Sequence, residues 1–156
     1  MSIEALDTTL GSSTSVLLDS TAFIAFHAAQ DATDALARHV LSRIERADDP
    51  LRGFYCVVSV AELLVRPVCA GPREEMYMHA FLTSFPNLQA LNVDFHVAHQ
   101  AANLRAVRNV KTPDALILAC GLLAGCEAIV GNDEAWVTRL KPLFPEFRWI
   151  YLPSYL

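Results

Sequence analysis

Short apolar segments alternate with helical segments along most of this chain, and this alternation limits the possible folds more than any other feature. Residues 16–18, Val-Leu-Leu, are typical, because they are fully apolar, too short for a helix and followed by a helical segment. Strands of this kind need cover on both faces, and strands joined through helices run parallel. We therefore predict an α/β fold with a central parallel sheet of four or five strands and helices on both faces. The predicted strands are 16–18, 54–58, 88–93, 128–130 and 148–151.

The spacing of apolar residues predicts the helices between these strands. The helix from Asp94 to about Arg108 has an inward stripe of Val97, Ala101, Leu104 and Val107. Ser59 is the expected N-cap of a helix that Pro67 ends. The helix that starts at Thr112 is apolar on every side, which is typical of a helix buried within a domain. Further helices are predicted around 36–44, 73–84 and 134–140.

The length and hydropathy of the chain indicate one domain. At 156 residues and 53% hydrophobic composition, the chain can bury one core. Residues 1–14 are polar and aperiodic, so we expect a flexible N-terminal tail followed by a single domain over 15–156. No apolar run approaches the roughly twenty residues that cross a bilayer, and no export signal is recognisable. We therefore expect a cytoplasmic protein.

Cysteine spacing and net charge exclude several classes of site. The four cysteines lack Cys-x-x-Cys spacing and stand mostly among aliphatic residues, which favours buried free thiols over disulfides or a zinc site. A net charge of -5 argues against a protein that holds nucleic acid by bulk electrostatics alone. This net charge is compatible with a local basic rim or a bound cation.

Four acidic residues follow predicted strands or begin helices at one edge of the predicted sheet. Asp19 directly follows the first strand and Asp133 the fourth, while Glu62 lies in the helix after the second strand and Asp114 opens the buried helix. Ligands of parallel α/β sheets bind beyond the carboxyl ends of the strands. We therefore expect these four side chains to converge on one cleft.

Each acid also has a purely structural explanation. Asp19 is a favoured N-cap for a helix that begins near Thr21. Glu62 has the spacing to close a capping box with Ser59 or to pair with Arg66. Asp114 and Asp133 would each stabilise the positive end of a helix dipole.

The four acids together indicate a cation site. Carboxylates that converge on one cleft repel one another, and some of their pKa values rise unless a cation neutralises them. A set of oxygen ligands with no His or Cys at metal spacing suits a hard ion such as Mg²⁺ or Mn²⁺. Such an ion can activate water and bind the oxygens of a phosphodiester.

Three stretches of the chain have a distinctive pattern: VLLDSTAFIAF, VVSVAELLVRP and VDFHVAHQAANLRAVRNVKTPDALILACGLLAGCEAIVGNDEAW. They resemble the PIN-domain ribonucleases, most of all the VapC-type toxins of VapBC toxin-antitoxin pairs. The last stretch carries the most specific part, a Pro-Asp-Ala helix start and an Asn-Asp turn that closes on an aromatic residue. The resemblance covers nearly the whole chain after residue 14 and implies a PIN-like three-layer fold.

The resemblance also implies a function and the residues that perform it. Asp19, Glu62, Asp114 and Asp133 stand where the family keeps its catalytic acidic metal ligands, and Ser20 and Asn132 match polar positions that support the site. The implied activity is Mg²⁺- or Mn²⁺-dependent hydrolysis of a tRNA, rRNA or mRNA by a toxin. The implied partners are a cognate antitoxin protein and a second copy of the chain, with the helix from Met76 to Phe85 as a candidate dimer contact. The candidates for holding RNA phosphates are Arg66, Arg105, Arg108 and Lys111.

Two departures from the family pattern keep alternatives open. Gly131 stands where the family commonly has a Thr or Ser hydroxyl that helps to hold the acidic cluster, and Trp136 replaces the usual Phe. One alternative is a catalytically inactive PIN-like module that binds protein or RNA. Another is a phosphatase with Asp19 as nucleophile, although haloacid dehalogenase-type phosphatases place a second Asp two positions later, where this chain has Thr21.

Overall fold

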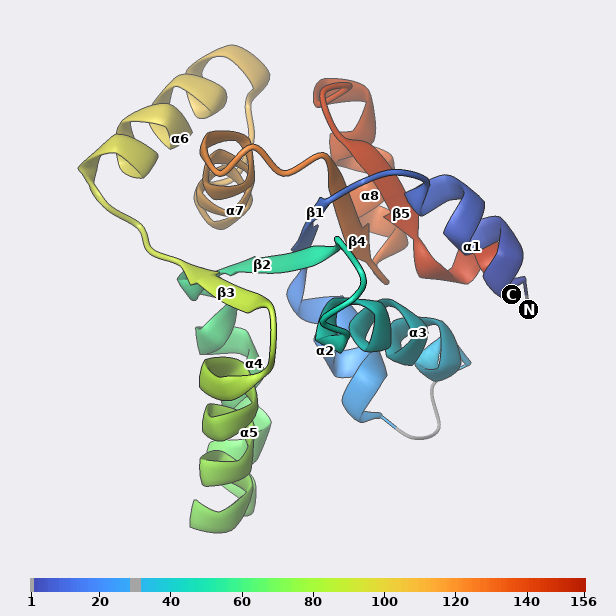
Figure 1. Ribbon diagram of the computed structural model, residues 1–156. Helices are drawn as coiled ribbons and strands as arrows, with labels where there is room; N and C mark the ends of the chain where they lie inside the picture. The colour runs from blue at the N-terminus through green and yellow to red at the C-terminus, as the bar shows by residue number, and fades with distance from the viewer. Residues whose placement is uncertain (1, 29–31) are drawn as a thin grey trace.

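The computed structural model describes residues 2–28 and 32–156, which form an α/β fold around one sheet (Figure 1). The strands are β1 (Ser15–Leu18), β2 (Arg52–Cys56), β3 (Leu88–Leu91), β4 (Ala128–Gly131) and β5 (Arg148–Tyr151). All neighbouring strands pair in parallel, in the order β3-β2-β1-β4-β5. The predicted parallel α/β architecture is confirmed, with five strands in the sheet.

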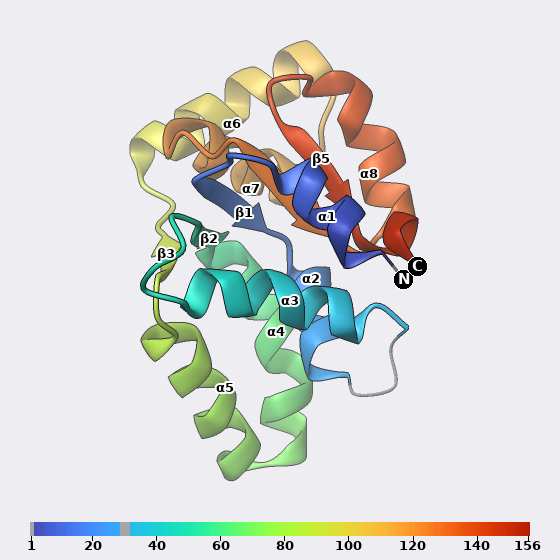
Figure 2. The ribbon, with the colours of Figure 1, turned by 45° about the vertical axis from the view of Figure 1, so that its right-hand side comes forward.

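Helices cover both faces of the sheet, as Figures 1 and 2 show. One face carries α6 (Phe95–Arg108), α7 (Thr112–Leu123) and α8 (Glu134–Leu140). The other carries α1 (Ile3–Leu10), α2 (Ser20–His27), α3 (Asp34–Glu45), α4 (Val57–Ala70) and α5 (Pro72–Ser84). Two short 3₁₀ helices complete the described chain, at Lys141–Leu143 and Leu152–Tyr155.

Alternating side chains of the strands divide the core into two clusters. In β1, Val16 and Leu18 pack on the face covered by α1 to α5, whereas Leu17 packs on the opposite face. β4 behaves in the same way, with Val130 on the first face and Ile129 on the second. Successive side chains of a strand point to opposite faces, so a fully apolar strand serves both clusters.

Residues 3–10 form helix α1, which corrects the prediction of a flexible tail over residues 1–14. Ser2 is the N-cap, and its hydroxyl accepts a hydrogen bond from Ala5 N. Leu6 and Leu10, four residues apart on one helix face, are fully buried in the core. The Ser2 backbone N–H also donates to Tyr155 O across 2.7 Å, which places the start of the helix beside the end of the chain.

A network of ion pairs joins α1 to α3 and to the turn before β2. Arg43 of α3 lies 3.0 Å from Asp7 of α1 and 2.9 Å from Asp49, and His39 lies 2.8 Å from Asp7. The Arg43 and Asp49 side chains are only 16% and 10% exposed. The hydrogen bond from Arg43 holds the pKa of the Asp49 carboxyl below its ordinary value, against the opposing effect of burial.

We expect Arg43→Met to lower the free energy of unfolding by about 2 kcal/mol at neutral pH, because it leaves a poorly solvated carboxylate without its partner. A carboxyl group whose pKa is lower in the folded than in the unfolded state stabilises the fold at pH values above its unfolded-state pKa. This stabilisation disappears as the pH falls through the folded-state pKa. The difference in the free energy of unfolding between wild type and variant should therefore become smaller below about pH 4. Urea unfolding at several pH values measures this difference.

Arg46→Met is the matched control, because Arg46 pairs with Asp48 at the surface, where the two side chains are 61% and 73% exposed. This variant should be nearly as stable as wild type, since exposed ion pairs contribute little. Equal losses for the two variants would contradict the assignment of Arg43 as an anchor of α1.

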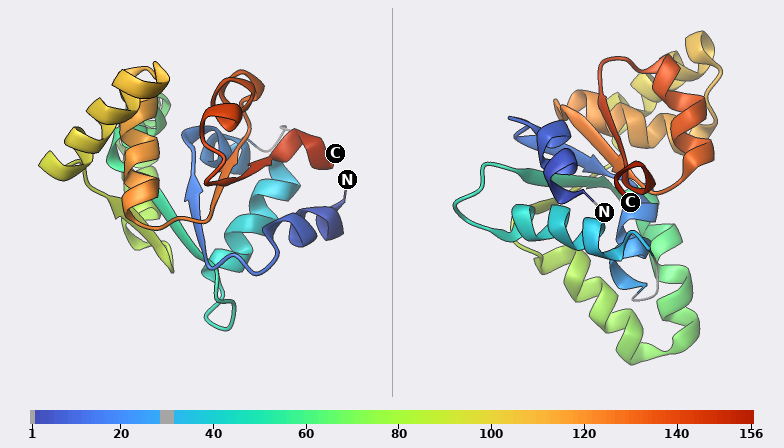
Figure 3. Two further views of the ribbon diagram at one scale, coloured as in Figure 1. Left: turned by 90° about the horizontal axis from the view of Figure 1, so that it is seen from above. Right: turned by 90° about the vertical axis from the view of Figure 1, so that its right-hand side faces the viewer.

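Helices α4 and α5 form an antiparallel pair that projects from the body of the fold (Figure 3). The predicted N-cap and stop of α4 are both wrong: Cys56 is the N-cap, Ser59 lies within the helix, and the helix continues through Pro67 to Ala70. Gly71 ends it with a φ of 135°, a backbone conformation that favours glycine.

The cysteines are free, and three of the four, Cys56, Cys120 and Cys126, are buried as expected. Cys69 is exposed on the projecting helix. Within the described part of the chain, no helix has the length and apolar character needed to span a membrane.

Candidate active site

The four predicted acids line one pocket at the carboxyl edge of the sheet. We call it the acidic pocket; its volume is about 240 Å³. It is lined by Asp19, Ser20, Thr21, Glu62, Lys111, Pro113, Asp114, Ile117, Asp133, Trp136 and Arg139. The acids come from the ends of β1 and β4, from the second turn of α4 and from the first turn of α7, because parallel strands direct all their following segments to the same edge.

Asp19 is a buried member of the four acids and is only 6% exposed. It is the N-cap of α2, and its Oδ2 accepts hydrogen bonds from Thr21 N at 3.2 Å and from Thr21 Oγ1 at 2.6 Å. Burial raises the pKa of the Asp19 carboxyl, and the nearby charge of Glu62 acts in the same direction. The side chain therefore caps a helix, and its charged form is disfavoured mainly by burial, with a smaller contribution from the charge of Glu62.

Glu62 lies on α4 and contacts the segment after β1. Ser20 Oγ donates a hydrogen bond to Glu62 Oε2 across 2.5 Å, and Ser20 is buried. The capping-box explanation for Glu62 is wrong, because Ser59 is not the N-cap of α4. The contact holds the Glu62 side chain toward the end of β1, where Asp19 lies.

Asp133 and Asp114 approach from the other side of the pocket. Asp133 is the N-cap of α8, and its Oδ1 accepts hydrogen bonds from Ala135 N at 2.8 Å and Trp136 N at 3.2 Å. Asp114 lies in the first turn of α7, where its charge is favourable to the helix dipole. Its Oδ1 accepts a hydrogen bond from Trp136 Nε1 at 3.1 Å, and its Oδ2 forms an ion pair with Arg139.

Thr21 supplies the hydroxyl that Gly131 lacks. A Cβ atom at Gly131 would lie 3.6 Å from Thr21 Oγ1 and 3.8 Å from Asp19 Oδ2, so the Thr21 hydroxyl lies next to the position where a side chain at residue 131 would begin. Thr21 Oγ1 also accepts a hydrogen bond from Asn132 N at 2.8 Å. Asn132 therefore supports the pocket through its backbone, while its side-chain Oδ1 accepts a hydrogen bond from Thr33.

We expect Thr21→Val to lower the free energy of unfolding by about 1–3 kcal/mol, because it deprives both Asp19 Oδ2 and Asn132 N of a hydrogen-bond partner. Urea unfolding at neutral pH measures the loss. Thr21→Ser keeps the hydroxyl and should stay close to wild type. A valine variant as stable as the serine variant would show that this hydroxyl does not hold the turn after β4.

The donor atoms of the pocket suit a hard divalent cation, since they are carboxylate oxygens supported by hydroxyls. Their present arrangement is not a formed metal site, because residues 2–28 and 32–156 contain no group of three or more His, Cys, Asp or Glu side chains placed to hold a metal ion. Both oxygens of Asp114 accept hydrogen bonds from α8, and each keeps a second lone pair. The chemistry of the residues thus fits the cation.

Two positively charged side chains line the acidic pocket, those of Lys111 and Arg139. Lys111 was among the predicted phosphate-binding residues, whereas Arg139 was missed. Of the other candidates, Arg108 pairs with Glu146 at 2.7 Å and Arg105 is exposed on α6. Arg139 lies three residues after Trp136 on α8, and residues at this spacing share one helix face.

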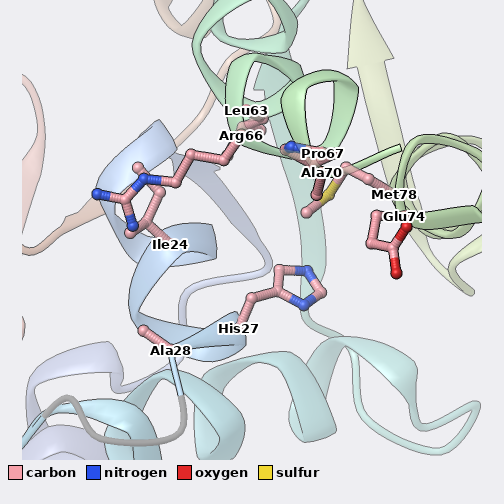
Figure 4. A pocket seen from close by; sticks show the side chains of 9 residues that line it. All are labelled: Ile24, His27, Ala28, Leu63, Arg66, Pro67, Ala70, Glu74 and Met78. Atoms are coloured by element: carbon pink, nitrogen blue, oxygen red, sulfur yellow. The ribbon is translucent and has the colours of Figure 1, made fainter. Parts of the chain in front are cut away.

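A second pocket of about 280 Å³ lies between α2, α4 and α5 (Figure 4). We call it the apolar pocket; it is lined by Ile24, His27, Ala28, Leu63, Arg66, Pro67, Ala70, Glu74 and Met78. Arg66, another predicted phosphate-binding residue, extends from α4 toward α2 here, outside the lining of the acidic pocket. Leu63, which lines the apolar pocket, directly follows Glu62 on α4, which lines the acidic pocket.

Several solved structures share this fold, and three of them have the following similarities. A toxin-antitoxin complex from Klebsiella pneumoniae has a TM-score of 0.66 at 17% identity, covering 88% of this chain and 97% of its own. VapC20 from Mycobacterium tuberculosis, a toxin that cleaves the sarcin-ricin loop, has a TM-score of 0.62 at 16% identity over 79% and 93%. VapBC2 from Rickettsia felis, bound to a promoter DNA fragment, has a TM-score of 0.60 at 11% identity over 88% and 98%.

The comparison of sequences identifies the family of the chain. None of the curated proteins matches the chain. The model of the PIN domain matches residues 16–139, a range that begins in β1, ends in α8 and contains all four acids of the acidic pocket. The chain belongs to the PIN-domain family.

Proposed function

We propose that this protein is a metal-dependent endoribonuclease and acts as the VapC-type toxin of a type II toxin-antitoxin pair in the cytoplasm. The observation that carries the proposal is the convergence of four carboxylates on one pocket of a PIN domain. Clustered acids destabilise a fold, so their presence indicates a cation and a reaction that uses it.

Asp19, Glu62, Asp114 and Asp133 would hold one or two Mg²⁺ or Mn²⁺ ions. A bound ion of this kind supplies an activated water and neutralises charge on the phosphodiester. Ser20 and Thr21 orient the carboxylates of Glu62 and Asp19 through the hydrogen bonds described above. Lys111 adds a positive charge at the pocket, suited to a phosphate of the RNA backbone.

The partner we propose is an antitoxin that covers the acidic pocket. The support is that two of the structures with this fold are toxin-antitoxin or VapBC complexes. The apolar pocket, which Leu63 lines one residue after Glu62 on α4, suits a helix or extended tail of such a partner, with a basic side chain reaching the acids. We also propose a homodimer, with contacts through Met76 and Tyr77 of α5, which are 68% and 62% exposed.

Nuclease activity is tested by incubating the purified chain with total RNA and with plasmid DNA, in Mg²⁺, in Mn²⁺ and in excess chelator. The proposal predicts fragments from RNA only, formed with either metal, and their loss in chelator. Cleavage that persists in chelator would contradict the metal-dependent mechanism.

The toxin role is tested by controlled expression in a bacterial host. Growth should stop when the chain is induced alone, and it should continue when Asp114→Asn is induced to the same level. Unimpaired growth with active wild-type enzyme in the cell would contradict a toxin.

A non-catalytic PIN-like binding module is the second candidate, and one observation favours it: the acids of the described chain are not grouped as metal ligands. Calorimetric titration with Mg²⁺ separates the two, because an inactive module should give no metal-dependent heat. A phosphoenzyme on Asp19, sought by mass spectrometry after incubation with phosphate monoesters, would support the phosphatase alternative instead.

A further inference from the structure

A guanidinium lies within the acidic pocket. Arg139 Nη2 donates to Asp114 Oδ2 in an ion pair, while Trp136 Nε1 donates to Asp114 Oδ1 across 3.1 Å. Both oxygens of Asp114 therefore accept hydrogen bonds from α8. Asp114 is also one of the four proposed metal ligands, so a divalent cation and Arg139 require the same carboxylate.

Of the two α8 side chains that donate hydrogen bonds to Asp114, Arg139 is the one that can move away from it. Trp136 and Arg139 are three residues apart and hence lie on one helix face. Trp136 is only 7% exposed, and its ring packs against Trp149 with centroids 5.3 Å apart, so the indole is fixed. The Arg139 side chain is 45% exposed. It can leave Asp114 by rotating about its own side-chain bonds, without displacing α8.

We propose that Arg139 is the resident counter-ion of the acidic pocket and sets the affinity for divalent cations by competing with them for Asp114. In the metal-free chain, the guanidinium neutralises Asp114 beside three further carboxylates. A divalent cation at the same carboxylate repels the guanidinium and displaces it. The inference rests on the proposed metal site and adds a residue that controls its occupancy.

Arg139→Gln should therefore bind Mn²⁺ about fivefold more tightly than wild type, which corresponds to the upper range for one exposed ion pair. Lys111→Gln is the matched control. It removes one positive charge from the lining of the same pocket, and Lys111 takes part in none of the ion pairs of the described residues. The Mn²⁺ affinity of Lys111→Gln should rise less than that of Arg139→Gln, because only a positive charge near the site is lost. Arg139→Lys keeps the charge and should stay close to wild type.

Calorimetry measures the affinities, and an NMR titration with Mg²⁺ reports whether Asp114 is engaged. The chain has two tryptophans, so a ¹⁵N-labelled sample gives two indole N–H signals. The Trp136 signal should shift on metal binding, because its N–H donates to Asp114. The Trp149 signal should shift much less, because its N–H donates to Phe144 O across 2.9 Å.

The outcomes separate this inference from the metal site itself. A shift of the Trp136 signal, with tighter binding by Arg139→Gln than by Lys111→Gln, supports the competition. The same shift with equal affinities for the two glutamine variants overturns it while leaving the metal site in place. No heat and no Trp136 shift in any variant removes both the metal site and the competition.

Discussion

Asp19→Asn should lose RNA cleavage by more than about 100-fold while the protein stays folded. Changes to groups that merely support a metal ligand cost about 10- to 100-fold, so the loss of a ligand charge should exceed that range. Asparagine keeps the volume of the side chain and is itself a good N-cap, so the hydrogen bond to Thr21 N at the start of α2 can persist. In the absence of metal, the thermal midpoint should equal or exceed that of wild type, because repulsion with Glu62 falls.

Asp94→Asn provides a matched control for this prediction. Asp94 is also an N-cap that follows a strand, with Oδ1 accepting from Val97 N at 2.8 Å, but it lies outside the lining of the acidic pocket. Cleavage by Asp94→Asn should match wild type. If Asp19→Asn also cleaved RNA at the wild-type rate, the assignment of the catalytic pocket would be wrong.

Phe23→Ala should lower the free energy of unfolding by about 3–5 kcal/mol, the usual cost of removing a fully buried phenyl ring. Phe23 of α2 is 0% exposed and contacts Tyr55 and Phe81 edge-on, with ring centroids 5.8 Å and 6.0 Å apart. The same helix begins at Ser20, directly after Asp19, so this ring also anchors the segment that positions both residues. Urea unfolding followed by circular dichroism measures the loss.

Phe95→Ala removes the same side chain from the surface, where Phe95 is 86% exposed, and should change stability little. A loss below about 1 kcal/mol for Phe23→Ala would show that α2 is not anchored through the core.

The sheet and the convergence of the acids could be predicted from sequence because both depend on local patterns. Apolar strands such as 16–18 and 128–130 leave little choice of structure, and parallel connection sends Asp19 and Asp133 to the same edge. The predicted N-cap Asp19 also marks its helix correctly, because it caps α2.

The errors arose where local composition and tertiary packing disagree. The Ser and Thr residues of the first segment hid the four-residue spacing of Leu6 and Leu10, so α1 was missed. Val107 was predicted to face inward, but it is 81% exposed. The left-handed Asn109, with a φ of 51°, ends the helix and brings Val110 into the core instead.

The contacts inside the acidic pocket could not be read from sequence for a different reason. Thr21 and Arg139 reach their partners through side-chain conformations set by packing, across 111 residues from Thr21 to Asn132 and 25 from Asp114 to Arg139. No local pattern predicts which hydroxyl replaces the one absent at Gly131. These pairings become visible only once α2, α7 and α8 are placed beside one another.

The most direct test of the central claim is to follow RNA cleavage and Mn²⁺ binding in the same preparations of wild type and Asp114→Asn. The account predicts that wild type binds Mn²⁺ and cuts RNA at defined positions, and that both properties are lost or greatly weakened together in the variant, with the fold intact. Cleavage by Asp114→Asn at the wild-type rate, or cleavage by wild type without any bound metal, would contradict it.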